Sequence, residues 1–299
     1  MERIATDRLA ATIEPDCGGG LFSLVHDPDG AAAEVLATPD PALIAERDPL
    51  GLPCFPLVPY SGPVIGGILA IEGERVELAR NHADEPEPIH GEGWISPWTV
   101  TRRSATRLHL AFEHDPAARP GGFPRAYAAT LSYALEDATL TASLDVTNRD
   151  SRPMPAGLGL HPYFPKTADT VLGFAARGVW SETPMSDSRP LAPVPDAWVF
   201  DPPRPVGDLA VDRCFEGWNG RATLDWPRRG LTVAIEAAPP LTRLVVFAPP
   251  GRDFLCVEPV SNANDAHALA AAGIEGHGLV PLASGESLSG TMRLTVSAR

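Results

Sequence analysis

The chain has 299 residues, of which 44% are hydrophobic and 21% are charged, and its formal net charge is −14 at pH 7. This apolar content is too high for a disordered chain and indicates a protein with a large core. The acidic balance argues against nucleic acid or an anionic membrane surface as a partner, because both are bound through clustered cations. No run of about 18 apolar residues occurs, so we expect no transmembrane helix and no membrane partner.

The first residues and the cysteines indicate the compartment. The segment 1–20 carries acidic residues among its apolar ones and has no hydrophobic stretch of the kind found in signal peptides, so we expect a cytoplasmic protein. Cys17, Cys54, Cys214 and Cys256 are widely scattered and form no C-x-x-C pair. We therefore expect free thiols rather than disulfides or a structural zinc site.

Strand patterns dominate the first half of the chain, and the 33 prolines and 27 glycines predict many turns. We expect strands at 3–13 and 20–26, a hairpin over 67–78 that turns at 72–74, and a strand pair within 98–114. The clearest pattern is a hairpin over 126–147 that turns at Glu136 and Asp137. Apolar and polar residues alternate in both of its arms, which predicts one buried face and one wet face.

The second half begins with a proline-rich stretch, 157–207, that we expect to be irregular, with long loops at 115–124 and 167–205. Further strands are expected at 222–226, 231–237, 241–247, 254–257 and 289–297, and a short helix at 265–272. Short strands at regular spacing predict an all-β sandwich or barrel. No repeat or linker divides the chain, so we expect residues 1–299 to form a single domain.

Two histidines are candidates for chemistry, His90 in PIHGEGW and His161 in GLGLHPYFP. Histidine followed by glycine or proline is expected at a strand end, where sites are often built. The alternative for each is a structural histidine whose ring is simply hydrogen-bonded.

Two acids are candidates as well. In FLCVEPV, Glu258 ends an apolar strand and precedes a proline. Burial there would raise its pKa and make it a usable base. Asp212 lies in VDRCFEGW. For both acids the alternative is an ordinary solvated carboxylate.

Metal and nucleotide sites have little support. The pairs His82-x-Asp84 and His90-x-Glu92 resemble parts of a metal site, but the spacing marks no third ligand. The chain has no G-x-S-x-G, no Walker loop and no G-x-G-x-x-G after a strand. We expect no metal and no cofactor.

Taken in order, the segments RNHADEPEPIHGEGWISPW, PAGLGLHPYFP, DRCFEGWNG and LCVEPVSNANDA resemble the aldose 1-epimerase (galactose mutarotase) family. The resemblance spans nearly the whole chain, from about residue 9 to 296. It implies a large antiparallel β-sandwich with an open sugar-binding cleft. It also implies an isomerase that interconverts the α and β anomers of a free sugar without a cofactor.

The resemblance also implies roles for particular residues. Glu258 would be the base that takes the C1 hydroxyl proton, and His161 the acid that protonates the ring oxygen, with His90 supporting that oxygen or a neighbouring hydroxyl. Asp212 would bind sugar hydroxyls. Many members carry an arginine after Asn or Gly in the segment that corresponds to 59–67, where this chain has none. Arg80, next to Asn81, is the candidate substitute for binding the sugar.

Two other functions remain open. One is a catalytically silent carbohydrate-binding relative, and the other is a hexose-6-phosphate mutarotase, which would need cations for the phosphate. For the enzyme we expect a protonated His161 and an ionised Glu258 in the free protein. The expected partner is a small sugar, and the chain is expected to be a monomer or a homodimer.

Overall fold

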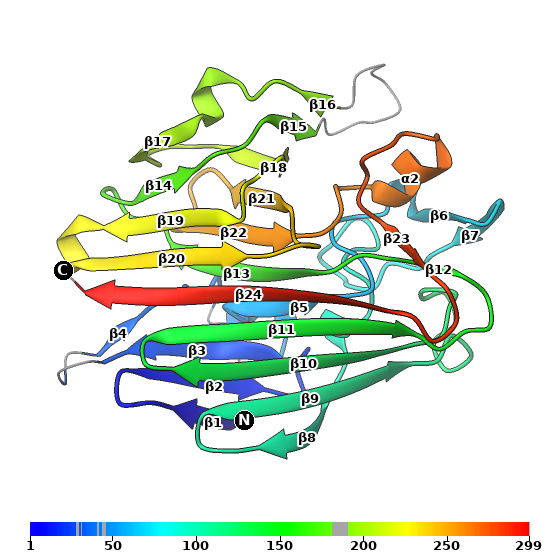
Figure 1. Cartoon of the computed structure of the whole chain (residues 1–299), viewed down its shortest axis with the longest axis horizontal. Coiled ribbons are helices and arrows are strands. Elements are labelled where there is room, and N and C mark those ends of the chain that lie inside the picture. Colours follow the sequence, from blue (N-terminus) through cyan, green and yellow to red (C-terminus); the bar gives the residue numbers. More distant parts are fainter. Residues whose placement is uncertain (28–29, 31, 41, 44–45, 181–190, 299) are drawn as a thin grey trace.

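The computed structural model describes residues 1–27, 30, 32–40, 42–43, 46–180 and 191–298. Two large sheets lie face to face, and every pairing between strands recorded within these ranges is antiparallel. Figure 1 shows one sheet across the front of the molecule and the other behind it. This arrangement confirms the expected all-β sandwich. No helix among the described residues is long and apolar enough to span a membrane.

The rear sheet has eleven strands within the described ranges. Their order is β1 (Glu2–Ala5), β2 (Leu9–Glu14), β3 (Gly20–His26), β5 (Cys54–Leu57), β13 (Gly159–Pro165), β22 (Phe254–Val260), β21 (Arg243–Ala248), β18 (Val211–Glu216), β15 (Gly178–Trp180) and β16 (Leu191–Ala192), with β4 (Ala33–Glu34) paired to β3. This sheet carries the site described below.

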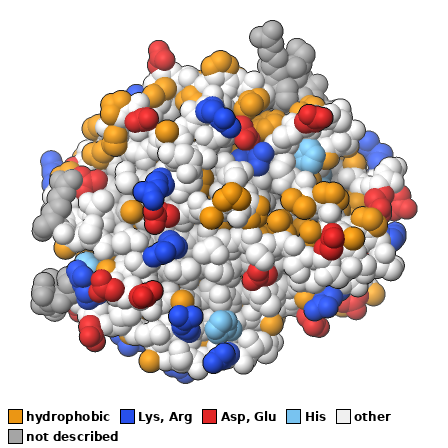
Figure 2. Space-filling view, in the orientation of Figure 1, with side chains coloured by type: hydrophobic (Ala, Val, Ile, Leu, Met, Phe, Trp, Pro, Cys, Tyr) orange, Lys and Arg blue, Asp and Glu red, His pale blue; other side chains and the backbone are white. Residues whose placement is uncertain are grey.

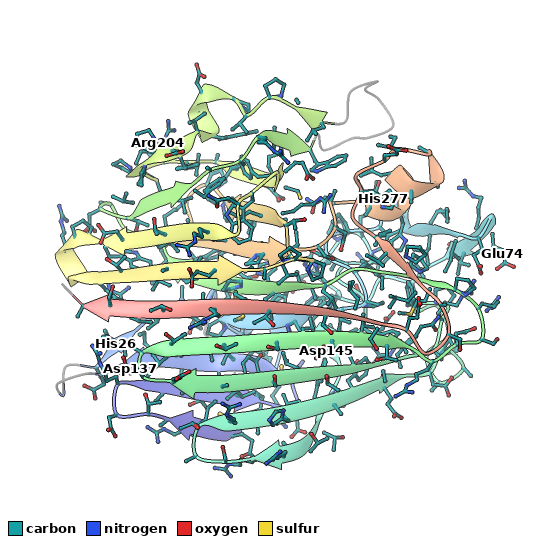
Figure 3. The ribbon with its side chains drawn as sticks, viewed as in Figure 1. His26, Glu74, Asp137, Asp145, Arg204 and His277 are labelled. Atoms are coloured by element: carbon teal, nitrogen blue, oxygen red, sulfur yellow. The ribbon has the colours of Figure 1, made fainter. Side chains whose placement is uncertain are left out.

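The front sheet has nine strands in the described part of the chain. Their order is β17 (Phe200–Pro205), β14 (Val171–Phe174), β19 (Arg221–Trp226), β20 (Leu231–Ala237), β24 (Ser287–Ala298), β11 (Thr139–Asn148), β10 (Tyr127–Glu136), β9 (Arg107–His114) and β8 (Thr99–Arg103). The outward side chains of β10, β11 and β24 are mostly Ser, Thr and Ala, and Thr130 donates to Asp145 at 3.1 Å there. Figure 3 labels Asp145 on this face.

Three smaller elements lie together at one end of the sandwich (Figure 1). They are the hairpin β6 (Ile68–Ile71) and β7 (Glu74–Glu77), the pair β12 (Met154–Ala156) and β23 (Val280–Leu282), and helix α2 (Ala266–Ala271). Short 3₁₀ turns occur at Pro49–Gly51, Ile65–Gly67, Gly93–Ile95, Asp196–Trp198 and Pro227–Arg229. Figure 2 shows hydrophobic side chains gathered over this end, where Pro153, Pro155, Leu279 and Pro281 line a groove.

Alternation along the strands divides the apolar residues between two clusters. Leu160 and Phe164 of β13 belong to the cluster that fills the space between the sheets. Tyr163 of β13 and Cys256 of β22 belong to a second cluster, together with Phe55 of β5. Because successive side chains of a strand point to opposite faces, the second cluster lies on the other face of the rear sheet. That face carries the pocket.

Most of the expected strands are confirmed, and three expectations are wrong. Residues 3–13 form two strands rather than one, because the Thr6 hydroxyl accepts from the N–H of Arg8 and of Leu9 and closes a turn. The stretch 157–207, expected to be irregular, contains β13, β14, β15, β16 and β17. Residues 181–190 of the loop expected at 167–205 lie outside the described residues. The third error is at 254–257, where β22 continues through Pro259 to Val260.

The remaining local expectations hold. The hairpin over 126–147 is present, with its turn one residue later than expected, between Glu136 and Thr139. The hairpin over 67–78 and the short helix at 265–272 are confirmed. The four cysteines are buried and free.

Candidate active site

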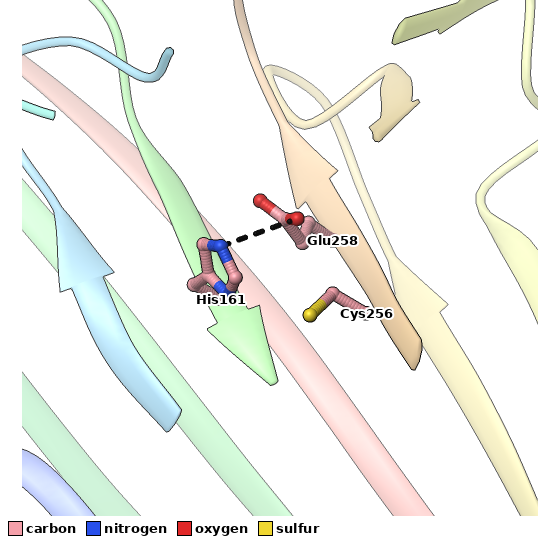
Figure 4. A group of neighbouring side chains, drawn as sticks. All are labelled: His161, Cys256 and Glu258. Carbon is pink, nitrogen blue, oxygen red and sulfur yellow. Dashed lines mark ion pairs between the residues drawn. The ribbon is translucent and has the colours of Figure 1, made fainter. Parts of the chain in front are cut away.

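His161 and Glu258 face each other on the outer face of the rear sheet (Figure 4). His161 Nε2 lies 3.4 Å from Glu258 Oε1, and their side chains are only 9% and 3% exposed. They stand opposite one another because β13 and β22 are antiparallel, with Gly159 opposite Val260 and Tyr163 opposite Cys256. Two ionisable groups at this distance in a dry place form one coupled pair.

Prolines contribute to this geometry. His161 and Glu258 were expected at strand ends because each precedes a proline, but both lie inside their strands. Pro162 and Pro259 have no N–H to donate to a neighbouring strand. Accordingly, the recorded partners in β13 and β22 are Gly159 with Val260 and then Tyr163 with Cys256. His161 and Glu258 lie in the interval between these partners and face the pocket.

Two aromatic rings pack against the His161 ring. Phe55 and Tyr163 each have their ring centroid 4.7 Å from the imidazole centroid, and the centroids of these two rings are 6.1 Å apart. Nδ1 of His161 is buried with no hydrogen-bond partner among the described residues, and Nε2 is the nitrogen that meets Glu258. Contact with both aromatic rings restricts rotation of the imidazole, which keeps Nε2 directed at the carboxylate.

His90 enters the site from a loop. Its φ is 61°, and that of Gly91 is 68°, where any Cβ would lie 2.4 Å from the Val58 carbonyl oxygen. This tight turn brings the imidazole of His90 edge-on to His161, with centroids 5.6 Å apart. The N–H of Gly62 donates to His90 Nδ1 at 3.0 Å.

These side chains line one pocket of about 410 Å³. Four of the expected site residues lie in its wall: His90, His161, Asp212 and Glu258. The rest of the wall includes residues that the sequence analysis did not single out: Phe55, Ser61, Glu85, Glu87, Tyr163 and Asn264. No lysine or arginine of the described residues lines it. The pocket therefore combines a buried acid–base pair with an acidic, cation-free wall.

Arg80 and Asn81 do not line this pocket. The Arg80 guanidinium donates to the Glu85 carbonyl oxygen at 3.4 Å and is exposed. The Asn81 side chain donates to the carbonyl oxygens of Ile89 and Gly91 and accepts from the Ile89 N–H. Asn81 thus holds the loop that carries His90 instead of facing the pocket, and the place of the missing arginine is not filled by Arg80.

Burial opposes the protonation states expected from the sequence. Burial lowers the pKa of His161 to about 3. Burial, with a contribution from the charge of Asp212, raises the pKa of Glu258 well above its usual range. Both shifts favour the neutral form of each group. These directions favour a pair that carries one proton, on Glu258, and no net charge.

Of the two metal-like pairs seen in the sequence, His90-x-Glu92 uses its carboxylate for contacts within the protein. Glu92 accepts from the Phe123 N–H at 2.7 Å and from the Tyr127 hydroxyl at 3.2 Å, so its carboxylate is used within the protein. His82 Nε2 lies 3.0 Å from both oxygens of Asp48, a neighbour that no spacing could reveal.

Two groups of potential metal ligands occur among the described residues, with their ligand atoms within 4.8 Å of one another. They are Asp48, His82 and Asp84, and His161, Cys256 and Glu258. In the second group burial raises the pKa of the Cys256 thiol well above its usual range, which favours the thiol over the thiolate that binds metal.

The chain is an antiparallel β-sandwich that carries a pocket on the outer face of one sheet, with a buried His–Glu pair in the wall of that pocket. A family model described as aldose 1-epimerase matches residues 4–295. The chain therefore belongs to the aldose 1-epimerase family.

Individual relatives agree with this assignment. The uncharacterized protein YphB of Escherichia coli (strain K12) is 33% identical over 251 residues, which cover 81% of this chain and 83% of that protein. The structure of a putative aldose 1-epimerase from Escherichia coli K12 has a TM-score of 0.84 at 28% identity and covers 99% of this chain and 98% of that one. A GalM/aldose epimerase homologue from C. elegans, at 16% identity, has a TM-score of 0.81 over 99% of this chain and 98% of that one, and shows the same fold.

Proposed function

We propose that this protein is a cofactor-independent aldose 1-epimerase that interconverts the α and β anomers of a free, uncharged sugar. The observation that carries the proposal is the His161–Glu258 pair, 3.4 Å apart in the wall of a 410 Å³ pocket. Opening a sugar ring removes one proton from the C1 hydroxyl and adds one to the ring oxygen. A carboxylate and an imidazole that together hold one proton can do both.

The reaction follows from the position of that proton. When a sugar with a closed ring is bound, the proton first passes from Glu258 to His161. This transfer leaves a carboxylate and an imidazolium. Glu258 then takes the proton of the C1 hydroxyl, the bond from C1 to the ring oxygen breaks, and His161 protonates the ring oxygen. The product is the open-chain aldehyde beside a protonated Glu258 and a neutral His161. Rotation about C1–C2 and the reverse transfers close the other anomer.

The wall of the pocket supports an uncharged substrate. Glu85, Glu87 and Asp212 line it along with Glu258, and no described lysine or arginine does. Phosphate is held in proteins by cations in bidentate or clustered contacts. This charge pattern argues against the hexose-6-phosphate alternative. A purely binding relative would not need the buried pair, which costs free energy to desolvate.

The test is one-dimensional NMR saturation exchange between anomers, across a panel of reducing sugars. The wild-type protein should exchange at least one neutral aldose, and Glu258→Gln should lose about 100-fold or more in rate, because an amide cannot accept the proton. Glu236→Gln is the matched control, since Glu236 is on β20 of the other sheet and pairs with the exposed Arg221. Binding of sugars without exchange of any of them would favour the silent relative.

A further inference from the structure

The surroundings of His90 fix both its backbone and its ring. Asn81 Nδ2 donates to the carbonyl oxygens of Ile89 at 2.6 Å and Gly91 at 2.8 Å, and Asn81 Oδ1 accepts from the Ile89 N–H at 3.0 Å. One carboxamide thus binds the residues on both sides of His90. It stabilises a loop in which His90 itself adopts a left-handed conformation, with φ at 61°.

The hydrogen bond from Gly62 decides the tautomer of His90. A backbone N–H can only donate, so Nδ1 must accept and cannot carry a proton. A neutral imidazole whose Nδ1 accepts carries its proton on Nε2. A second proton on Nδ1 would point at the Gly62 N–H, so the imidazolium is incompatible with this contact. The ring, 7% exposed, therefore presents an N–H donor.

The same loop is tied to the segment that follows Glu258. Asn262 Oδ1 accepts from the Ser61 N–H at 3.1 Å, and its Nδ2 donates to the Ser61 carbonyl oxygen at 2.8 Å. Ser61 immediately precedes Gly62, so the donor to His90 is fixed relative to the end of β22. The ionisable groups that line the pocket with His90 are Glu85, Glu87, His161, Tyr163, Asp212 and Glu258. The acids among them favour a cation, and the Gly62 contact opposes it.

The contact of His90 with the sugar follows from the family resemblance; we propose that His90 makes it as a permanently neutral ring with its proton on Nε2, and that Asn81 is the positioning residue that holds the ring there. The proposal rests on the proposed function for the identity of the ligand. It separates His90 from the acid–base pair: proton transfer belongs to His161 and Glu258 alone. It also changes the role of Asn81, which acts on the sugar only through His90.

The tautomer is tested first on the free protein, independently of any activity. Imidazole ¹⁵N–¹H correlation spectra, assigned with His90→Gln, should show the Nε2–H tautomer of His90 and no titration of its shifts from about pH 5 to 8. A protonated Nδ1, or shifts that titrate in this range, would overturn the proposal even if the protein exchanges anomers. Absence of exchange with an Nε2–H tautomer would instead count against the proposed function.

A pair of substitutions separates donation from proton transfer. His90→Gln can place an amide N–H near the position of Nε2, whereas the shorter side chain of His90→Asn can only replace Nδ1. If His90 donates a hydrogen bond, His90→Asn should lower kcat/KM about 100-fold, which is the usual effect of losing one donor to a reacting oxygen. His90→Gln should have a kcat/KM about tenfold higher than that of His90→Asn. Equal loss in both variants would mean that His90 transfers a proton.

The role of Asn81 has a matched control elsewhere in the chain. Asn148 makes the same set of contacts, donating to the carbonyl oxygens of Arg152 and Leu282 and accepting from the Asp150 N–H, and it does not line the pocket. Asp at either position keeps the acceptor and removes both donors. Both variants should melt at a lower temperature than the wild type.

Only Asn81→Asp should change the ¹⁵N shifts of His90. It should also lower kcat/KM by up to about 100-fold, because the His90 ring would be misplaced, and leave the limbs of the pH profile where they are. Asn148→Asp should keep wild-type exchange. An Asn81→Asp protein as active as Asn148→Asp, or one whose pH limbs shift, would refute the positioning role. If Asn81→Asp does not fold, the two His90 variants and the spectra still decide the proposal.

Discussion

Acid should destabilise this protein through His267, a buried histidine outside the reactive pocket. His267 is 2% exposed, and its ring meets that of Tyr60 edge-on, with centroids 5.2 Å apart. Its Nε2 is buried, with no hydrogen-bond partner in the described part of the chain. Burial, with a smaller effect of His277, lowers its pKa from 6.5 to about 3. Below pH 6.5 the unfolded chain therefore binds a proton that the folded protein does not, so the free energy of unfolding falls as pH falls from 6.5 towards 3. At about 1.4 kcal/mol per pH unit, the loss is about 2 kcal/mol at pH 5.

The assay is urea unfolding followed by tryptophan fluorescence at several pH values between about 5 and 8. His267→Phe keeps a ring against Tyr60, and it should reduce the difference in free energy of unfolding between pH 8 and pH 5 by about 2 kcal/mol. Phe123→Leu is the control, because Phe123 is a fully buried neighbour of His267 that does not titrate. It should lower stability equally at each pH. A wild-type pH dependence in His267→Phe would refute the reasoning.

Four further outcomes follow from the site. Exchange should have an acidic limb near pH 3 from His161 and a basic limb from Glu258 well above pH 4.5; an acidic limb near pH 6.5 would contradict the lowered pKa of His161. Glu258→Gln should unfold at higher urea concentration than the wild type at pH 8, and the gain should vanish below pH 4.5, because a raised folded pKa removes stability as pH rises. Exhaustive EDTA treatment should leave the NMR exchange rate unchanged, whereas activity lost and then restored by a metal would refute the cofactor-free mechanism. Glucose 6-phosphate should show kcat/KM about tenfold or more below that of glucose, given the acidic wall, and equal values would revive the sugar-phosphate alternative.

The fold was predictable where the apolar pattern is local. The arms of β10 and β11 alternate strictly, and Glu136 and Asp137 mark the turn within one residue. Prediction failed where proline was read as a strand breaker. Pro162 and Pro259 lie inside central strands. Proline is normally excluded from such strands because it cannot donate to a continuous ladder of hydrogen bonds between neighbouring strands. The ladder between β13 and β22 is open at this point, which no single strand reveals.

The candidate site was predictable only in part. The wall of the pocket brings together His90, His161, Asp212 and Glu258, which the resemblance had named. Asn81 donates to residues that lie eight and ten positions further along the chain, Ile89 and Gly91. The contact of Gly62 with His90 spans 28 residues. Such contacts leave no periodic signal in the sequence. The sequence already indicated that burial raises the pKa of Glu258. The burial that lowers the pKa of His161 depends on the rings of Phe55 and Tyr163 that pack against it, which the sequence does not show.

Sharing one proton explains how an acid and a base can both be buried in this pocket. A separate imidazolium and carboxylate would each lose hydration, at a cost of several kcal/mol per ion. A neutral His161 beside a protonated Glu258 avoids that cost, and this is the state in which the proposed reaction leaves the pair once the ring is open. The shifted pKa values favour, in the free protein, the protonation state that suits the aldehyde. In the proposed reaction the proton crosses 3.4 Å from Glu258 to His161 before the closed ring opens. Because both states have the same net charge, burial opposes the transfer less than it would oppose creating a new charge.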